Sequence, residues 1–415
     1  MNKNIFETLK ERGYVYQATH EEEIKKVLNG EEPITFYLGI DPTADSLHIG
    51  HFFALMLFRH LQDAGHRGIL LVGGATVMIG DPSGKSDMRK MITKEEVRHN
   101  LEEVKELAKK FIKTDGDNPA IIVNNADWIN SYSYIDFMRD VGIHFNVNVM
   151  LAAEAYANRL EEGGLTFLEM GYMLMQAYDF VHLNKKYGCK LQIGGSDQWG
   201  NIVAGTNLGR KLNFVDGLEK DEMFGLTNPL LMTNDGKKMG KTETGTLWVA
   251  REKTTVFDFY QYFYNVKDED VEMLLRLFTR VEIDKILDLC KNDIVKAKRL
   301  MAFEVTKLVH GEEEAQKAQD TAISLFSGGA DNANMPSTTL SESDFNGKDS
   351  ISVIDLLVIS KLAPSRGEAR RLIEQGGVCV GDEKVPDINH TVNKKDIENE
   401  IIIKKGKKVF HKIVL

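Results

Sequence analysis

Buried strands alternate with helices between about residues 30 and 205, and this alternation constrains the fold more than any other feature of the chain. The apolar run 34–40 ends at the turn signal Asp41-Pro42-Thr43, and a second apolar run follows at 68–72. A helical stretch lies between them over 47–64, with Ser46 as its expected cap. A strand, a helix and another strand in this order predict an α/β fold with a doubly wound parallel sheet.

The remaining segments predict further elements and a division of the chain. Strands are expected near 120–124 and 189–193, and helices over 14–32 and 94–113. The pattern becomes helical after residue 250, and the glycine- and asparagine-rich run that begins at Ser327 is typical of a linker. The expected parts are a sheet domain over 1–248, a helical domain over 249–325, a linker over 326–350 and a small α+β domain over 351–415.

Charge is divided unevenly along the chain. The tail 351–415 holds 12 Lys and Arg against 9 Asp and Glu, a net charge of +3, which leaves −13 for the rest of a chain whose total is −10. This split fits a small nucleic-acid-binding module attached to an acidic enzyme, and excludes a wholly basic nucleic-acid coat.

Cysteine spacing and hydropathy indicate the compartment. Cys189, Cys290 and Cys379 lie far apart, which fits a reducing environment without a disulfide framework. No apolar run reaches the roughly 18 residues of a membrane span, and the polar start of the chain lacks a signal-peptide core. We therefore expect a cytoplasmic protein without a membrane partner.

The motif His48-Ile49-Gly50-His51 stands between the first strand and the helix that follows it. A helix start offers unpaired N–H groups and a positive dipole end, which bind anions. The two imidazoles can add donors to a phosphate, and Gly50 lets a flat base approach the backbone. A pair of plain surface histidines, or half of a metal site, is the alternative, but the strand–turn–helix context favours phosphate binding.

A basic loop, Asp235-Gly-Lys-Lys-Met-Gly-Lys-Thr242, follows later in the chain and would alone suggest a solvated surface. Together, the two motifs resemble the His-Ile-Gly-His and Lys-Met-Ser-Lys-Ser motifs of class I aminoacyl-tRNA synthetases, whose catalytic domain is Rossmann-like. Gly240 and Thr242 stand in place of two serines, a form common in the tyrosine branch of that family. The resemblance implies that pyrophosphate is held by His48, His51, Lys238, Lys241 and Thr242, with Lys85 and Arg89 closing over it.

The segment Gly80-Asp-Pro-Ser-Gly-Lys-Ser86 looks like a nucleotide-binding P-loop, but three residues separate its glycines where four are required. No G-x-G-x-x-G motif follows an expected strand either. A Walker site and a dinucleotide site are therefore disfavoured.

Polar side chains form a stripe on the otherwise apolar segment 167–180. Tyr172, Gln176 and Asp179 recur there at helical spacing and share one face. A buried carboxylate needs a donor, so the alternative is a stripe satisfied by another domain. Tyr37 on the first strand can join Asp179 in holding a phenolic hydroxyl.

The amide and the phenol of this stripe can also bind an ammonium group together with Asp81. These sets resemble the tyrosine site of bacterial tyrosyl-tRNA synthetases. The resemblance implies that Tyr37 and Asp179 read the substrate hydroxyl, and that Asp81, Tyr172 and Gln176 read its α-amino group.

The stretch 191–202 predicts a strand, a glycine turn and a helix, where Gly194 and Gly195 permit close approach of a ribose and Asp197 can bind its hydroxyls. A plain tight turn is the alternative. The resemblance implies ribose contacts at Gly195 and Asp197 and a substrate-carboxyl contact at Gln198. It implies further ATP contacts at Gly39, Asp41, His48, Gly50, His51 and Lys241.

In the tail, the stretch from Ser365 to Val378 predicts a helix that ends at Gly376 and is followed by a strand. An ordinary α+β appendage with surface arginines is the alternative, but the segment resembles the S4 RNA-binding fold of bacterial tyrosine enzymes. Basic residues there and beside the catalytic sheet are the expected RNA contacts: Arg366, Arg370, Arg371, Lys404, Lys405, Lys407, Lys408, Arg210 and Lys211.

The resemblance extends over essentially the whole chain and implies an activity. L-tyrosine and ATP would give tyrosyl-adenylate and pyrophosphate, and tyrosine would then pass to tRNA(Tyr). ATP is then a substrate that carries Mg²⁺, and no tightly bound protein metal is expected. A homodimer is implied as well, with the apolar segments near Phe145 and Phe167 as interface candidates.

Three other functions are compatible with parts of the sequence. The same scaffold could charge tryptophan, but Tyr37 facing Asp179 speaks against an indole substrate. A small-molecule nucleotidyltransferase would not need the basic tail. An RNA-binding protein derived from a synthetase would not need His48, His51 and the lysines of the loop.

Overall fold

A computed structural model describes residues 4–83, 92–215, 222–242, 245–327, 337–345, 347–381, 383–406 and 409–415. The chain divides into two compact units. The first comprises Met1–Met239, Trp248–Ala250 and Met273–Ile283, and the second Gly240–Leu247, Arg251–Glu272 and Asp284–Leu415. The four-part division made from the sequence stays a prediction.

Six strands form one sheet in the described part of the first unit, in the order β1-β6-β5-β2-β3-β4. Every neighbouring pair is parallel except β1 with β6. The predicted doubly wound sheet is therefore confirmed, with one antiparallel edge strand added. The strands are β1 Gln17–Ala18, β2 Thr35–Ile40, β3 Arg67–Val72, β4 Ile121–Asn124, β5 Cys189–Gly195 and β6 Phe224–Asn228.

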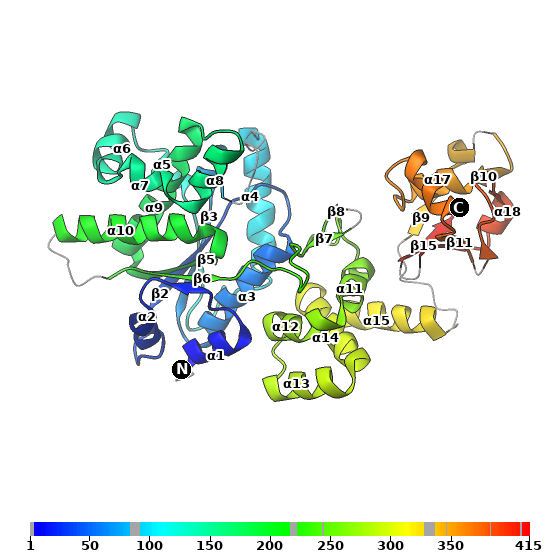
Figure 1. Cartoon of the computed structure of the whole chain (residues 1–415), viewed down its shortest axis with the longest axis horizontal. Helices are drawn as coiled ribbons and strands as arrows, with labels where there is room; N and C mark the ends of the chain where they lie inside the picture. The colour runs from blue at the N-terminus through cyan, green and yellow to red at the C-terminus, as the bar shows by residue number, and fades with distance from the viewer. Residues whose placement is uncertain are drawn as a thin grey trace. The chain divides into compact units, whose positions relative to one another are not determined.

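Helices cover both faces of this sheet, which is why β2 is apolar along nearly its whole length. The ring of Phe36 lies 4.8 Å from that of Phe58 on α3, whereas the ring of Tyr37 lies 5.2 Å from that of Phe180 on α9. Consecutive residues of one strand thus pack against helices on opposite sides (Figure 1). The helices of this region are α1 Ile5–Arg12, α2 Glu21–Leu28, α3 Ile49–Asp63, α4 Lys94–Ala108, α5 Ala126–Ile129, α6 Tyr134–Asp140, α7 Val147–Leu151, α8 Glu154–Glu162, α9 Phe167–Tyr187 and α10 Trp199–Val215.

Two local expectations were wrong. The helix expected over 14–32 is only α2, because residue 14 is buried and the segment after it forms β1 at the sheet edge. The Tyr14 hydroxyl donates to the carbonyl of Leu277, a tertiary contact that competes with a helix here. Ser46 is not the cap of α3, since its hydroxyl accepts from Ala250 N–H and His48 takes the cap position.

The second unit begins with a helical region. It contains α11 Val256–Tyr264, α13 Ile283–Asn292, α14 Ile294–His310, α15 Glu312–Ser327 and the first part of α12 Asp268–Phe278. A short hairpin, β7 Lys241–Thr242 with β8 Gly245–Thr246, precedes them. None of the helices in the described segments is long and apolar enough to span a membrane.

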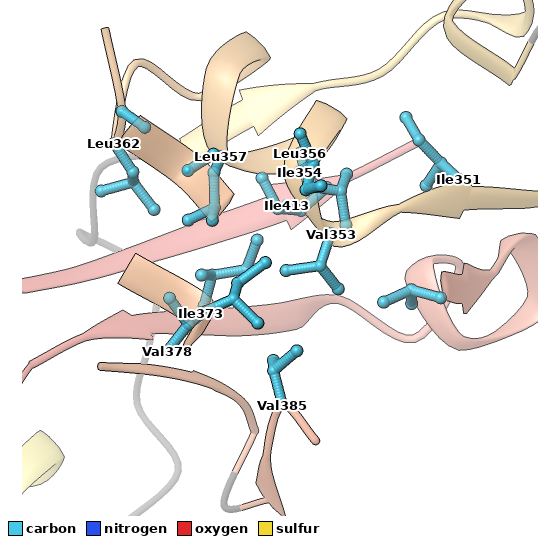
Figure 2. Close-up of a cluster of buried hydrophobic side chains, with 14 of the residues drawn as sticks. Ile351, Val353, Ile354, Leu356, Leu357, Leu362, Ile373, Val378, Val385 and Ile413 are labelled. Carbon is cyan, nitrogen blue, oxygen red and sulfur yellow. The ribbon is translucent and has the colours of Figure 1, made fainter. Parts of the chain in front are cut away.

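The tail is an α+β fold with its own hydrophobic core. Its main sheet has the order β12-β11-β14-β15-β9. Figure 2 shows aliphatic side chains from helices and strands, among them Leu356, Ile373 and Ile413, meeting in this core. The elements are β9 Ser337–Thr339, β10 Ser350–Ser352, α16 Val353–Ile359, α17 Arg366–Glu374, β11 Val378–Val380, β12 Glu383–Lys384, β13 Thr391–Asn393, α18 Lys394–Ile397, β14 Ile401–Lys405 and β15 Val409–Val414.

Candidate active site

The carboxyl ends of the parallel strands bring distant stretches of the chain to one edge of the sheet. Asp41 follows β2, Gly73 follows β3, Asn125 follows β4 and the turn 196–198 follows β5. β2 lies between β3 and β5, where the order of the strands reverses. Ligands of open α/β sheets bind at such a switch point, so the candidate site is placed at this edge.

Asp179 is the buried carboxylate of the polar stripe on α9, with 1% of its surface exposed. Trp128 Nε1 donates to its Oδ1 over 2.7 Å, and Asn125 Nδ2 donates to its Oδ2 over 3.0 Å. Burial raises the pKa of Asp179 to about 7, and these two hydrogen bonds act in the opposite direction. Its donors come from the same unit, so no other domain is needed to satisfy it.

Tyr37 is also buried, with 1% exposed, and its ring packs against Phe180, the residue after Asp179. Its hydroxyl has no hydrogen-bond partner within the described residues. Burial, reinforced by the charge of Asp179, raises the pKa of Tyr37 well above its usual value. A buried hydroxyl without a partner is costly, so these two side chains are suited to bind a further hydroxyl between them.

A hydrogen-bonded network connects Asp41 to Asp179 through Thr76 and Asn125. Asp41 accepts from Thr76 Oγ1 over 2.7 Å and from the Tyr172 hydroxyl over 2.9 Å. Asn125 Nδ2 donates to Thr76 Oγ1 over 3.0 Å as well as to Asp179. The glycine after β3 allows this approach, because a Cβ there would lie 2.0 Å from Asp41 Oδ1 and 2.2 Å from Thr76 Oγ1.

A second carboxylate group, Asp81, lies beside the turn after β5. Gln198 Nε2 donates to Asp81 Oδ2 over 2.6 Å. Gln176 has a buried side-chain oxygen without a partner in the part of the chain that the structure describes. The Tyr172 hydroxyl, from the same face of α9 as Gln176, donates to Asp41.

Asp197 lies close to charges of both signs. Burial raises its pKa, the charge of Asp81 adds to the rise, and the charge of Lys238 opposes it. At Gly195 a Cβ would lie 2.5 Å from Asp197 Oδ1, so a larger residue there would force this carboxylate to move.

His48 and His51 cap α3 reciprocally. The N–H groups of Gly50 and His51 donate to His48 Nδ1 over 3.1 and 3.2 Å, and His48 N–H donates to His51 Nδ1 over 3.4 Å. The rings stack with centroids 3.7 Å apart. The expectation that these N–H groups are open to an anion was therefore wrong. Because both Nδ1 atoms accept hydrogen bonds from the backbone, a neutral ring at either position carries its proton on Nε2.

The lysine loop is a hairpin at its start. Met239 N–H donates to Leu231 O over 2.9 Å. The side chain of Lys238, the residue before Met239, is exposed. The backbones of Lys241 and Thr242 form β7. The expected phosphate-closing residues Lys85 and Arg89 lie within 84–91, outside the described residues.

Two of the three tail arginines already have acidic partners. Arg366 pairs with Asp355, and Arg371 pairs with Glu368 over 3.4 Å. Arg370 is exposed on the same helix, α17, whose N-cap is Ser365. The other predicted RNA contacts comprise Lys404 and Lys405 on β14, Arg210 and Lys211 on α10, and Lys407 and Lys408, which lie outside the described residues.

Sequence reasoning missed Thr76, Asn125 and Trp128. Asn125 directly follows a parallel strand, at the edge where sites form, and this position could have revealed it. Trp128 carries no such signal, because an indole near the end of a short helix is most often a core residue. Its role shows only in the distance to Asp179.

Comparisons with known proteins show the family to which the chain belongs. A model described as class I tRNA synthetases (W and Y) matches residues 28–327, and a model of the SYY-like C-terminal domain of tyrosine–tRNA ligase matches residues 329–413. The tyrosine–tRNA ligase of Acetivibrio thermocellus is 52% identical over 416 residues, covering 99% of both chains. That of Clostridium tetani is 50% identical over 420 residues and covers 100% of both chains.

A solved structure agrees in fold. The C-terminally truncated mitochondrial tyrosyl-tRNA synthetase of Aspergillus nidulans superposes with a TM-score of 0.70 at 29% identity, over 78% of this chain and 95% of that one. The first family model includes tryptophan enzymes, but the C-terminal model and the full-length relatives are specific to tyrosine. The chain therefore belongs to the class I tRNA synthetases and, within them, to the tyrosine–tRNA ligases.

Proposed function

We propose that Tyr37 and Asp179 bind the phenol of L-tyrosine at the carboxyl edge of the sheet. The observation that carries this proposal is the unpartnered Tyr37 hydroxyl beside a buried carboxylate whose other contacts are fixed by Trp128 and Asn125. The substrate hydroxyl donates to Asp179 and accepts from Tyr37. A site of this kind rejects phenylalanine because its own buried groups would be left unpaired, a rule for which tyrosyl-tRNA synthetases are themselves a standard example.

The α-amino group of tyrosine is assigned to Asp81, Tyr172 and Gln176, and its carboxylate to Gln198. Support comes from the unpartnered Gln176 oxygen and from the Gln198–Asp81 hydrogen bond. This bond joins the residue assigned to the substrate carboxylate to a residue assigned to its ammonium group. The substrate carboxylate attacks the α-phosphorus of ATP, and the bond to pyrophosphate breaks. No protein nucleophile is needed, so catalysis consists of positioning and of charge stabilisation.

ATP is held in this proposal by residues around the ends of β2 and β5 and by the lysine loop. Gly195 and Asp197 bind its ribose, and Gly39, Asp41 and Gly50 line its approach. His48 and His51 donate from Nε2 to the phosphates, and the charge of the leaving pyrophosphate is met by Lys238, Lys241, Thr242, Lys85 and Arg89. Mg²⁺ enters with the phosphates, as it usually does in such sites.

The tail is proposed to hold tRNA(Tyr) through Arg366, Arg370, Arg371 and the lysines 404, 405, 407 and 408. Its net charge of +3 supports this assignment, since cationic side chains release counterions from phosphates. Arg210 and Lys211 are proposed as additional contacts. We also propose that the enzyme works in the cytoplasm.

Pyrophosphate exchange tests the substrate assignment. The full chain, ATP, labelled pyrophosphate and one amino acid at a time should give exchange with L-tyrosine, and little with phenylalanine or tryptophan. Equal exchange with phenylalanine would contradict the assignment of Tyr37 and Asp179.

We further propose a homodimer built on an exposed apolar surface between α6 and α9. Phe145 packs against the core of the first unit, but Ile143 and Phe167 are 74% and 70% exposed. Exposed apolar patches of this kind mark protein–protein interfaces. The exposed apolar side chains that we assign to this patch are Tyr134, Ile135, Ile143, Val147, Val149, Leu160, Phe167 and Leu168.

Light scattering after size-exclusion chromatography tests the dimer. Ile143→Asp should yield a monomer, because a charge would be buried without a partner in the interface. Leu287→Asp is the matched control, since Leu287 is an exposed leucine on α13 outside the patch. A wild-type monomer would overturn the proposal.

A further inference from the structure

Gly240 lies between Lys238 and Lys241 in the lysine loop, and both peptide groups that flank it are held. Its N–H donates to the Tyr262 hydroxyl oxygen over 2.9 Å. Its carbonyl accepts from Leu247 N–H over 2.8 Å. Gly240 has φ +87°, in the left-handed region that other residues rarely adopt, so the chain turns sharply where it is held.

The second peptide group leads directly into Lys241. Lys241 pairs with Thr246 and Thr242 with Gly245 in the short β7–β8 hairpin. The backbone of Lys241 is therefore fixed by strand pairing on one side and by the Gly240 turn on the other. The Tyr262 hydroxyl is a side-chain contact that holds this turn at the Gly240 N–H.

Tyr262 lies on α11, a helix that is held in place by its N-terminal cap and by its buried aromatic side chains. α11 begins at Thr255, whose hydroxyl accepts from Asp258 N–H over 3.1 Å. Phe259 and Phe263 on this helix are fully buried, and the Tyr262 ring packs edge-on against Phe263 at 5.3 Å. Burial raises the pKa of Tyr262, so the hydroxyl stays neutral at physiological pH.

We propose that Tyr262 is a positioning residue for adenylate formation, which holds the turn at Gly240 and thereby sets where Lys241 meets the leaving pyrophosphate. This inference rests on the proposed function of Lys241. Tyr262 touches no reacting atom in it. Its contribution is to limit the conformations of the glycine turn. Without this contact, the turn would have to be ordered each time the transition state forms, at a cost in entropy.

The variant Tyr262→Phe tests this role, since it removes the hydroxyl and keeps the ring against Phe263. Single-turnover adenylate formation should fall about 3–10-fold, the size expected from losing one hydrogen bond. Tyrosine affinity should stay at its wild-type value, and the melting temperature should fall by no more than the loss of one hydrogen bond explains. Tyr260→Phe is the matched control, because it makes the same chemical change on the same helix and the Tyr260 hydroxyl is not bonded to Gly240.

A double variant separates positioning from a general structural effect. If Tyr262 acts through Lys241, Tyr262→Phe should slow adenylate formation in the wild type but add little to the defect of Lys241→Ala. Multiplying defects in the double variant would overturn the inference. An equal fall in tyrosine affinity and in rate would also overturn it, because a distorted fold affects both.

The same variants distinguish the inference from the proposal on which it rests. A normal rate in Lys241→Ala would overturn the proposed function of the loop. A large defect in Lys241→Ala together with a normal rate in Tyr262→Phe would overturn the role of Tyr262 alone.

Discussion

The Tyr37 hydroxyl is buried without a partner among the described residues, while its ring is well packed against Phe180. In the ligand-free protein this hydroxyl therefore contributes a desolvation cost without a compensating bond. The Tyr37 hydroxyl therefore lowers the stability of the ligand-free protein, whereas in the proposed site it increases selectivity for tyrosine.

The variant Tyr37→Phe should change substrate selectivity and stability in opposite directions. Selectivity for tyrosine over phenylalanine should fall by about 2–10-fold, because one hydrogen bond worth about 0.5–1.5 kcal/mol is lost. Stability without substrate should stay equal or rise, because the unpartnered group is gone. Pyrophosphate exchange and thermal melting measure the two effects, and unchanged selectivity would remove Tyr37 from the site.

Asp179 should make stability depend on pH. Its pKa is raised from 3.8 to about 7 in the folded chain, so between these values the folded state binds more protons than the unfolded state. The free energy of unfolding must then fall as pH rises through this window. Asp179→Asn lacks this titration, so its stability relative to wild type should rise by about 2–4 kcal/mol between pH 4 and pH 8.

Urea unfolding at several pH values checks this prediction, since all other groups are common to both proteins. A difference that stays constant with pH would mean that Asp179 titrates normally in the folded chain. Tyrosine must be left out, because its phenol would contribute to the titration of the site.

Candidate site residues could be predicted from the sequence where helical periodicity places them on one face, and could not where only tertiary packing brings them to the site. Tyr172, Gln176 and Asp179 share a helix face, and that spacing is visible in the sequence. Thr76 and Trp128 reach the site through a turn and a short helix, and no local pattern marks them. The roles proposed for all these residues stay predictions.

At the scale of elements, α9 carries two exposed apolar residues of the proposed dimer patch, Phe167 and Leu168, and also the polar stripe proposed to bind tyrosine. Its first turn is held by a buried ion pair. Arg159 Nη2 lies 2.8 Å from Glu169 Oε1, and the two side chains are 6% and 4% exposed. Glu169 Oε2 also accepts from Thr166 N–H over 2.9 Å, which closes a capping box.

Arg159→Met should destabilise the protein by about 3–5 kcal/mol, because it leaves a buried carboxylate uncompensated. Adding Glu169→Gln removes that charge while an amide oxygen can still cap the helix, so the double variant should recover much of the loss. Chemical unfolding of the two variants decides the point. A double variant less stable than the single one would show that the pair stabilises α9 beyond its own desolvation.

The elements themselves followed from apolar periodicity where the core is continuous. The runs expected at 34–40 and 68–72 became β2 and β3 within one residue at either end. β1 has only two residues, and its place is set by pairing with β6 far along the chain, which no short window can reveal. Similarly, the helix start was misplaced by two residues, because a histidine took the capping position usually held by serine.

At the scale of the whole molecule, the tail core reaches further toward the linker than composition indicated. Leu340 and Phe345 are buried in it, although the tail domain was expected to begin at residue 351. These two residues lie among acidic and polar residues, so the composition of the segment predicted a linker and not a part of the core. A truncation meant to remove the tail cleanly should therefore end at Ser327.

A chain that ends at Ser327 should form tyrosyl-adenylate at nearly the full rate and charge tRNA(Tyr) poorly. The reason is that the proposed adenylate site lies entirely before this point, whereas most of the proposed RNA contacts lie after it. Burst formation of adenylate and aminoacylation of tRNA measure the two steps. Normal charging by the shortened chain would contradict the RNA-binding role of the tail.

The order of the tail sheet also has a consequence for synthesis on the ribosome. β9 is the first tail strand to emerge, and it pairs in parallel with β15, where Ser337 meets Lys412 and Thr339 meets Val414. Domains fold as their strands become available during translation. A nascent chain that ends between β9 and residue 409 would thus contain all six strands of the first sheet, but its β9 would lack the partner strand β15. The tail sheet can therefore close only after β15 has been translated.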